Sequence, residues 1–253
     1  MKMVTDAVIL MAGTGSRLRG DEATLPKPLL PLLGRPLISY LLDGLVRAGI
    51  ENVHAVVGYA AGRVVKETQA LVPSGLKAHF VENRDWQKQN GISVLAAAPH
   101  IRAPFLLTMS DHLFDLSLLR TLMQKAAVDC INLAVDRKIE SIFDIDDAMK
   151  VQTTDDRVVA ISKDLPGYDA IDTGFFVCAP ILFDYLTQAK RNEDCSLADG
   201  VRLAAAAGKV RAIDIGDAWW QDVDTPAMMA VAERRLRSQE ASRSAPANAR
   251  SDR

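Results

Sequence analysis

The sequence predicts an α/β fold in which a mixed, mostly parallel β-sheet is flanked by helices. Apolar strand-like runs alternate with amphipathic helical segments along the chain, as in parallel sheets whose strands are joined by helices. The 253 residues are 49% hydrophobic and 25% charged, which is the size and composition of a soluble domain with a substantial core. The expected strands are 7–11, 52–57, 77–82, 105–109, 130–135, 174–178 and 210–215. The expected helices are 37–48, 62–71, 91–98, 117–125, 181–189, 197–207 and one that begins near residue 225.

Local signals set the ends of two of these helices. The helix at 37–48 is amphipathic, and Gly49 follows it as a C-terminal cap. Thr225 or Asp224 is expected to cap the last helix. Pro226 suits the first turn of that helix, where no backbone N–H is needed.

Residues 136–174 have a different texture and predict a small β-hairpin insertion. Two short alternating segments, 150–153 and 158–162, are expected to form its strands on either side of a turn. We expect the hairpin to act as a lid or wall beside the main sheet, within a domain that spans residues 1–237. Residues 238–253 are rich in Arg, Ser and Ala, and are expected to form a disordered tail.

Composition excludes several classes of protein. A net charge of −2 lacks the basic excess of a nucleic-acid-binding protein. The cysteines Cys130, Cys178 and Cys195 show no metal-ligand spacing, and reduced thiols in a cytoplasmic protein account for them. We find no signal peptide and no apolar run near the ~20 residues that span a bilayer. A soluble cytoplasmic protein is expected, and no feature of the sequence sets its oligomeric state.

The loop at 12–17 follows the first expected strand and has the composition of a phosphate-binding loop. Gly13 and Gly15 let the backbone turn tightly against a phosphate, and successive N–H groups in such a turn bind anions. Arg17 adds a guanidinium that matches phosphate oxygens. Lys27 lies between two prolines, so its ammonium extends from a stiff segment. These parts indicate a nucleoside triphosphate site, and a plain strand-to-loop turn with solvated charges is the alternative.

Two better-known glycine loops do not fit. The phosphate loop Gly-x-x-x-x-Gly-Lys-Ser/Thr is absent from the sequence. Leu18 stands where the dinucleotide-binding fingerprint needs a third glycine. Binding of NAD or FAD is therefore not expected.

Aspartates follow two expected strands, where ligands bind in open α/β sheets. Asp111 comes directly after the strand at 105–109, and Asp222 and Asp224 lie between the last strand and the last helix. Mg²⁺ is commonly held by one or two carboxylates together with water and substrate phosphates. Asp111 and Asp224 therefore predict a Mg²⁺ site, and the alternative is that they cap a turn and a helix.

We expect the aromatic neighbours of these aspartates to pack rather than bind metal. His112 follows Asp111, and adjacent side chains in an extended chain point in different directions. Trp219 and Trp220 are expected to pack at the end of the last strand and to close the site.

The segments 10–18, 25–30 and 34–37 together resemble the signature of nucleotidyltransferases that attach a nucleotide to a sugar phosphate or a related phosphorylated alcohol. Over residues 4–237 the chain looks closest to the CTP-dependent enzymes that act on inositol 1-phosphate, although Ser110 stands where that family usually has glycine. The resemblance implies a Rossmann-like, GT-A-like nucleotidyltransferase fold. The further landmarks are 90–95, 107–112, 136–137, 150–151, 161–165, 169–176 and 220–225.

The resemblance also implies the site residues, with Arg17 and Lys27 as the catalytic pair nearest the reacting phosphorus. The expected nucleotide-binding residues are Ala12, Gly13, Thr14, Gly15, Ser16, Arg17, Lys27, Asn90, Gly91 and Ser93. The expected acceptor-binding residues are Asp136, Lys150, Lys163, Asp172 and Gly174. The expected Mg²⁺ ligands are Asp111 and Asp224. An alternative for the two lysines is that they are surface residues of the hairpin.

The activity that the resemblance implies is transfer of CMP from CTP to 1L-myo-inositol 1-phosphate, giving CDP-inositol and pyrophosphate. The acceptor phosphate would attack the α-phosphorus in line with Mg²⁺ assistance, and positioning and charge neutralisation would supply the rate. A separate membrane-bound CDP-alcohol phosphotransferase is expected to use the product. Three alternatives stay open: a cytidylyltransferase for phosphocholine or another alcohol phosphate, a sugar-1-phosphate uridylyl- or guanylyltransferase, and an inactive regulatory subunit that senses nucleotide.

Overall fold

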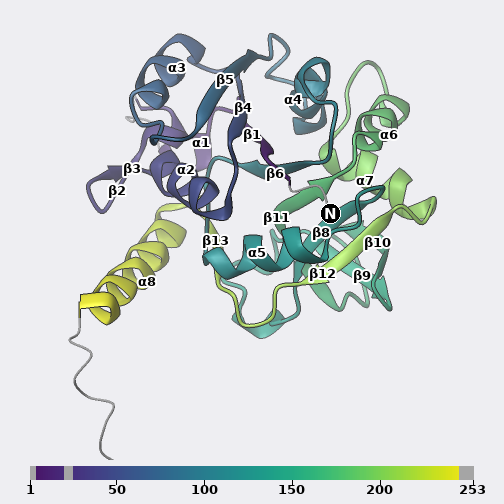
Figure 1. Ribbon diagram of the computed structural model, residues 1–253. Helices are drawn as coiled ribbons and strands as arrows, with labels where there is room; N and C mark the ends of the chain where they lie inside the picture. The colour runs from purple at the N-terminus through teal and green to yellow at the C-terminus, as the bar shows by residue number, and fades with distance from the viewer. Residues whose placement is uncertain (1–3, 20–24, 245–253) are drawn as a thin grey trace, which may run out of the picture.

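A nine-stranded β-sheet runs through the middle of the molecule, and helices pack on both of its faces (Figure 1). The computed structural model describes residues 4–19 and 25–244. The strands of the sheet are β1 Asp6–Met11, β4 Asn52–Val57, β5 Lys77–Glu82, β6 Phe105–Met109, β8 Ile131–Asp136, β9 Lys150–Thr154, β10 Arg157–Ser162, β11 Ala170–Cys178 and β12 Val210–Asp214. Shorter strands outside it are β2 Pro31–Leu32, β3 Arg35–Pro36, β7 His112–Phe114 and β13 Trp220–Asp222.

The sheet is mixed and mostly parallel, which confirms the expected fold class. Its strand order is β5-β4-β1-β6-β11-β8-β12-β10-β9. Within this sheet, β10 and β11 run against the direction of the other strands. The parallel strands bring their carboxyl ends to one edge of the sheet, where ligand sites of α/β proteins form.

Helices cover both faces because the apolar strands bury side chains on both sides. In β1, Val8 and Leu10 enter one core, whereas Ile9 and Met11 enter the other, as the alternation of side chains along a strand requires. The helices are α1 Ser16–Arg19, α2 Leu37–Ala48, α3 Ala61–Gln69, α4 Asn90–Ala97, α5 Leu116–Lys125, α6 Ile181–Ala189, α7 Leu197–Ala206 and α8 Pro226–Ser244, with short 3₁₀ turns η1 Lys27–Leu29, η2 Ala98–His100 and η3 Ile139–Ser141.

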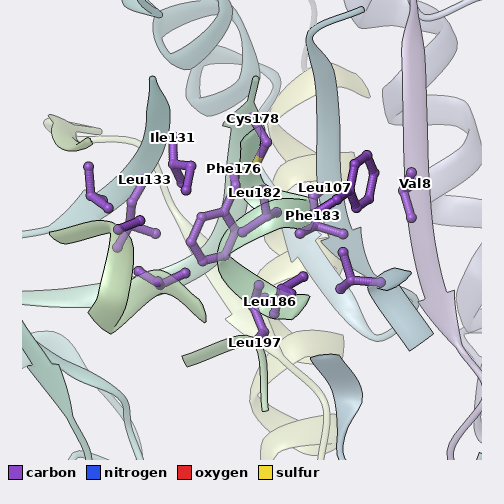
Figure 2. Packing of buried hydrophobic residues seen from close by; sticks show 14 of the residues in the cluster. Val8, Leu107, Ile131, Leu133, Phe176, Cys178, Leu182, Phe183, Leu186 and Leu197 are labelled. Atoms are coloured by element: carbon purple, nitrogen blue, oxygen red, sulfur yellow. The ribbon is translucent and has the colours of Figure 1, made fainter. Parts of the chain in front are cut away.

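Two hydrophobic cores lie on opposite faces of the sheet. One core packs α2, α3 and α5 against it. The other core packs α4, α6 and α7, and Figure 2 shows how it gathers side chains of β8 and β11, such as Leu133 and Phe176, with Leu182 and Leu186 of α6. The rings of Phe105 and Phe183 add a parallel stack with centroids 5.3 Å apart. None of the described helices is both long and apolar enough to cross a lipid bilayer.

The predicted hairpin in residues 136–174 is present, but it is part of the main sheet. Strands β9 and β10 pair with each other, β10 also pairs with β12, and β9 also pairs with the start of β11. Strands β11, β8, β12, β10 and β9 therefore close into a ring. The hairpin does not stand beside the sheet as expected, because it pairs within it and buries Val151, Val158 and Ile161 in the core on one face. Its expected role as a lid or wall stays a prediction.

Strand β11 begins earlier than predicted and joins the parallel strands to the ring, because it pairs with both β6 and β9. We expected it to start at Gly174, but it starts at Ala170 and pairs first with β9. Its register against β8 shifts between Asp172 and Phe176, and its second half pairs with β6. A pattern of apolar residues does not predict this irregularity around Gly174.

The last helix extends further along the chain than predicted. Helix α8 runs to Ser244, so residues 238–244 are helical rather than part of a tail, and residues 245–253 lie outside the described residues. The helix is attached to the body near this point. The Arg235 guanidinium lies 5.6 Å from the centre of the Trp219 ring, and Gln239 donates a 2.8 Å hydrogen bond to Asp115.

A histidine cluster lies near the N-terminal ends of the parallel strands. The His54 ring of β4 stacks on His79 of β5 at 5.2 Å and on His100 of η2 at 6.0 Å, and His54 Nε2 lies 3.6 Å from the Asp6 carboxylate. Burial and the neighbouring histidines lower the pKa of His54, and Asp6 does not fully offset them. The folded protein therefore disfavours the protonated form of His54.

This cluster contributes a loss of stability in mild acid. A lowered folded-state pKa means that the unfolded chain binds the proton first, so His54 lowers the free energy of unfolding as the pH drops below ~6.5, by at most ~1.4 kcal/mol per pH unit for one proton. We expect His54→Gln to remove this contribution, so that its free energy of unfolding rises relative to that of the unmodified chain between about pH 7 and pH 5, measured by urea denaturation at each pH. The exposed neighbour provides the control, because His79→Gln should keep more of the slope. An unchanged slope in His54→Gln contradicts the prediction.

Candidate active site

A cleft of about 1180 Å³ opens at the carboxyl ends of β1 and β6. Its lining includes the glycine loop after β1, the start of α4, the segment after β6, the middle of β11, residues 141–144 and 147–149, and β13. Sites for one small ligand usually measure ~300–1,000 Å³. The cleft is slightly larger than this range.

The glycine loop and Lys27 fit against each other. Gly15 has a φ of +63°, and a Cβ there would lie 2.4 Å from Cβ of Lys27. Lys27 belongs to η1, and 8% of its side chain is exposed. Gly15 is therefore needed both for its backbone conformation and for the space that Lys27 fills.

Lys27 bridges the two aspartates that we predicted as metal ligands. Its ammonium donates hydrogen bonds to the carboxylates of Asp111 and Asp224, which are themselves largely buried. Strand β13 aligns these aspartates, because Asp222 pairs with His112 in register and the Val223 N–H donates to the Asp111 carbonyl at 3.1 Å. Segments more than 100 residues apart thus converge on one cation.

The charges in this cluster stabilise one another against burial. Burial alone would lower the pKa of Lys27, but the charges of Asp111 and Asp224 outweigh it and raise that pKa. Burial alone would raise the pKa of Asp111, but Lys27 and His112 hold it well below its ordinary value. Burial likewise opposes protonation of His112, and Asp111, whose Oδ1 is 2.6 Å from His112 Nδ1, raises the pKa of that histidine. Each of these three groups therefore shifts the pKa of its neighbour toward the charged form.

The neighbours of the cluster behave largely as predicted. His112 pairs with Asp111 and stacks on Trp220 at 6.3 Å between ring centroids. Asp222, which the sequence placed at this strand end without a role, lines the cleft and is partly buried. Burial and the nearby charges of Asp111 and Asp224 raise its pKa, although His112 acts in the opposite direction.

The donor set fits a magnesium ion. Asp111 and Asp224 come from different strand ends, and the Lys27 ammonium lies between their carboxylates. A metal ion shared by the two carboxylates would take a similar position. Among the described residues, no group of three or more His, Cys, Asp or Glu side chains forms a closed metal site. Two carboxylates with a shell completed by water and substrate phosphates are typical of Mg²⁺.

The predicted nucleotide-binding residues fall into two groups. Asn90 and Ser93 line the cleft, and both are held in place: Asn90 Oδ1 accepts a hydrogen bond from the Leu197 N–H at 2.8 Å, and Ser93 accepts one from Asn83 at 3.0 Å. Ala12, Gly13, Gly15, Ser16, Arg17 and Lys27 also line the cleft.

Thr14 and Gly91 are not among the residues that line the cleft. A Cβ at Gly91 would lie 2.6 Å from the carbonyl oxygen of Cys195, so this glycine allows α4 to pack against the segment before α7. Gly91 is therefore a packing residue within this signature. Its expected contact with the nucleotide stays a prediction, because Gly91 does not line the cleft.

The two predicted acceptor lysines are separated by the fold. Lys163 lines the cleft just after β10, whereas Lys150 does not line it. The Lys150 ammonium instead donates to the carbonyls of Asp146 at 3.3 Å and Ala148 at 3.4 Å, and lies 5.9 Å from the Tyr168 ring. Lys150 therefore holds the end of the segment before β9, and its expected contact with the acceptor stays a prediction.

The remaining acceptor residues, Asp136, Asp172 and Gly174, all line the cleft. Asp136 is buried and already accepts hydrogen bonds from Lys138 and, at 2.9 Å, from the Trp220 indole N–H. Burial raises the pKa of Asp172 to about 6, and the Gly174 N–H and His112 act against this rise. Gly174, with φ +75°, lies so close to His112 that a Cβ would be 2.2 Å from its Nε2.

Asp147 is a charged residue at the cleft that the sequence analysis did not single out. Asp147 accepts a 2.7 Å hydrogen bond from Arg17 Nη1 and is also ion-paired to Lys163, while Arg17 Nη2 reaches Asp224 at 2.8 Å. The hydrogen bond from Lys163, together with that from Arg17, keeps the pKa of Asp147 below its ordinary value. The acidic run 144–147 was the available signal, but a sequence does not say which of its carboxylates reaches across the cleft.

A glycine loop beside paired carboxylates, at the carboxyl edge of a mostly parallel sheet, is the arrangement expected of a nucleotidyltransferase. The family comparison agrees, since residues 7–142 match the MobA-like NTP transferase domain, and the chain belongs to this family. The predicted reaction class and the predicted nucleotidyltransferase fold are thereby confirmed.

Individual relatives extend the similarity beyond the family model. The chain is 34% identical over 90% of its length to the bifunctional IPC transferase and DIPP synthase of Rubrobacter xylanophilus, and 31% identical over 88% to that of Aquifex aeolicus. It spans about half of these relatives, 51% and 50% of their lengths. The solved inositol-1-phosphate CTP transferase from T. maritima superposes with a TM-score of 0.84 at 27% identity, covering 94% of this chain and 96% of that one.

The loop geometry predicts different outcomes for its two glycines. Gly15→Ala forces a left-handed backbone on a residue with a Cβ and pushes against Lys27, so we expect it to lower the free energy of unfolding by ~1–3 kcal/mol. Gly13→Ala is the matched control, because a Cβ there meets nothing within 4 Å, and it should change stability by less than ~0.5 kcal/mol. Urea denaturation of both variants makes the comparison, and equal losses of stability would refute this account of the loop.

Proposed function

We propose that the chain transfers CMP from CTP to 1L-myo-inositol 1-phosphate and releases pyrophosphate. The observation that carries the reaction type is the buried cluster of Lys27, Asp111 and Asp224 beside the glycine loop. Support for the base and the acceptor comes from the similarity along nearly the whole chain to the inositol-1-phosphate CTP transferase from T. maritima.

In this proposal the glycine loop and its cations bind the triphosphate. Backbone N–H groups of residues 13–16 face the phosphates, and Arg17 and Lys27 neutralise charge at the α-phosphorus. Asp111 and Asp224 would hold Mg²⁺, which supplies further charge neutralisation on the phosphates when bound. Lys27 must release the carboxylates as the triphosphate enters, because its ammonium lies between them in the free protein.

The chemical step is a direct displacement. An oxygen of the acceptor phosphate forms a bond to the α-phosphorus of CTP, and the bond from that phosphorus to the bridging oxygen of the β-phosphate breaks, so that pyrophosphate leaves. The second ionisation of a phosphate monoester has a pKa near 6, so the attacking oxygen is already charged at neutral pH. The site therefore works by orientation and charge, and needs no strong general base.

The acceptor would bind on the side of the cleft formed by β10 and β11. Lys163 lines the cleft there and would hold the acceptor phosphate. Asp172 would bind polyol hydroxyls, and with a pKa of about 6 it could accept hydrogen bonds from them at neutral pH. Asp136 has its own partners in Lys138 and Trp220, so we assign it the orientation of Trp220 at the cleft wall.

We place the reaction in the cytoplasm, where CTP is available, and propose that a membrane-bound CDP-alcohol phosphotransferase uses the product. The prediction that this second enzyme is a separate chain stays a prediction. The curated relatives carry both the IPC transferase and the DIPP synthase name on a chain about twice the matched length.

The proposal is tested by pyrophosphate release over a grid of four NTPs and several acceptors. We expect release with CTP and inositol 1-phosphate in the presence of Mg²⁺, and loss of release when EDTA removes the metal. Activity with UTP or GTP and a hexose 1-phosphate, or with CTP and phosphocholine alone, overturns the acceptor assignment. Nucleotide binding without turnover for any pair identifies a regulatory subunit instead.

Variants of the charged cluster test the mechanism in the same assay. Asp111→Asn and Lys27→Ala should each lower kcat by ~10²-fold or more, because each removes charge directed at the transferring phosphoryl group. Asp43→Asn serves as the control, because Asp43 is a surface residue of α2 whose carboxylate pairs with Arg35 of β3. Full activity in the first two variants refutes the mechanism.

The acceptor lysines provide a separate prediction. Lys163→Ala should raise the KM for the acceptor by ~10- to 100-fold, the cost of losing a hydrogen bond to a charged group, with little change in the KM for CTP. Lys150→Ala should change the acceptor KM by less than ~3-fold, because that ammonium faces the carbonyls of Asp146 and Ala148. Steady-state kinetics in both substrates decide it, and equal effects of the two variants contradict the assignment.

A further inference from the structure

A single carboxylate connects the two sides of the cleft in the ligand-free protein. Asp147 is hydrogen-bonded to Arg17, on the side of the glycine loop, and to Lys163, which follows β10 on the acceptor side. The three side chains are half exposed, at 56% for Arg17, 38% for Asp147 and 49% for Lys163. Cations that come from opposite walls are therefore close enough for one anionic group to bind both.

The arrangement is unexpected for a site that binds phosphates. In the proposed function, Arg17 contacts the triphosphate and Lys163 contacts the acceptor phosphate, so their shared neighbour lies where the two phosphoryl groups must meet. A carboxylate carries one negative charge, and its oxygens resemble those of a phosphate in size and hydrogen-bonding capacity. Asp147 thus stands in the position of a ligand oxygen.

The rest of its segment favours a role at this place. Lys150 holds the backbone on both sides of Asp147 through the carbonyls of Asp146 and Ala148. Residues 141–144 and 147–149 line the cleft, so the segment lies along it rather than apart from it. Half-exposed ion pairs are individually weak, and an entering phosphate with more charge and more acceptor oxygens can replace them.

We propose that Asp147 is a specificity-determining residue that occupies the phosphate subsite between Arg17 and Lys163 and yields it to dianionic phosphoryl groups. This inference rests on the proposed function, in which those two cations bind phosphates. Because Asp147 is tethered beside the subsite, it competes at a high effective concentration. A singly charged ligand offers no more charge than Asp147 does and is rejected. A phosphate monoester or pyrophosphate offers at least two charges and displaces it.

The test measures anion binding without turnover. Inorganic pyrophosphate, and in parallel inositol 1-phosphate and CTP, are titrated into the metal-free full chain by calorimetry. We expect Asp147→Asn to bind pyrophosphate about 2- to 30-fold more tightly than the unmodified chain, the range for removing competition from two half-exposed ion pairs. The parallel titrations tell whether the triphosphate or the acceptor phosphate gains more.

A neighbouring aspartate gives the matched control for net charge. Asp146→Asn removes the same charge one residue away, from an exposed side chain that is not among the residues lining the cleft, and should leave binding within ~2-fold of the unmodified chain. The ratio of affinities for methyl phosphate over dimethyl phosphate should also fall in Asp147→Asn and not in Asp146→Asn. Binding in Asp147→Asn that is unchanged, weaker, or no tighter than in Asp146→Asn overturns the inference.

Failure of this inference and failure of the proposed function are distinguishable. If Arg17→Ala and Lys163→Ala both leave pyrophosphate and inositol 1-phosphate binding unchanged, the phosphate roles of these residues are refuted. If those variants weaken binding while Asp147→Asn does not strengthen it, the phosphate subsite stands and the role of Asp147 falls.

Discussion

The ion cluster of Lys27, Asp111 and Asp224 is the interaction on which the rest of the site depends. Buried charges are tolerated when each has a partner, and here one ammonium satisfies two carboxylates at once. The surrounding chain is shaped to permit this. Gly15 leaves space for the lysine stem, and the short β7–β13 pairing sets the two aspartates side by side. Two carboxylates that hold one positive charge between them can also hold a metal cation that neutralises charge on a transferring phosphoryl group.

The molecule divides the work between two parts of one sheet. The parallel strands β5, β4, β1 and β6 present the glycine loop and the first aspartate at their carboxyl ends. The ring of β11, β8, β12, β10 and β9 brings Lys163 and Asp172 to the cleft, on the side to which we assign the acceptor. The core stays continuous across both parts, since side chains of β1 and β8 belong to the same cluster. The cleft is lined largely by segments that follow these strands, and the packed strands fix where those segments begin.

Much of this was predictable because the signals are local. Uninterrupted apolar runs located the strands, and glycine and proline marked the phosphate loop and the helix ends. Contacts between distant segments were not predictable in this way. The closure of the ring depends on β9 meeting β11, which no pattern within the hairpin encodes. Lys150 and Lys163 look alike in the sequence, yet the fold turns one of them to backbone carbonyls and the other to the cleft. Gly91 is a further case. A glycine is needed there because Cys195, which lies between α6 and α7, packs closely against it.

Strand β11 has a mechanical consequence for this enzyme. It is hydrogen-bonded to β9 through its first residues, to β6 through its second half and to β8 through both. Because one strand takes part in the pairing of both halves of the sheet, rotation of one half against the other would strain the backbone hydrogen bonds of that strand. Many transferases enclose their substrates by domain rotation, but a shared strand favours adjustment by side chains and by the segment between β8 and β9. Under the proposed function, a change of acceptor during divergence would fall on that segment and on the rim of the ring, with the nucleotide half left as it is.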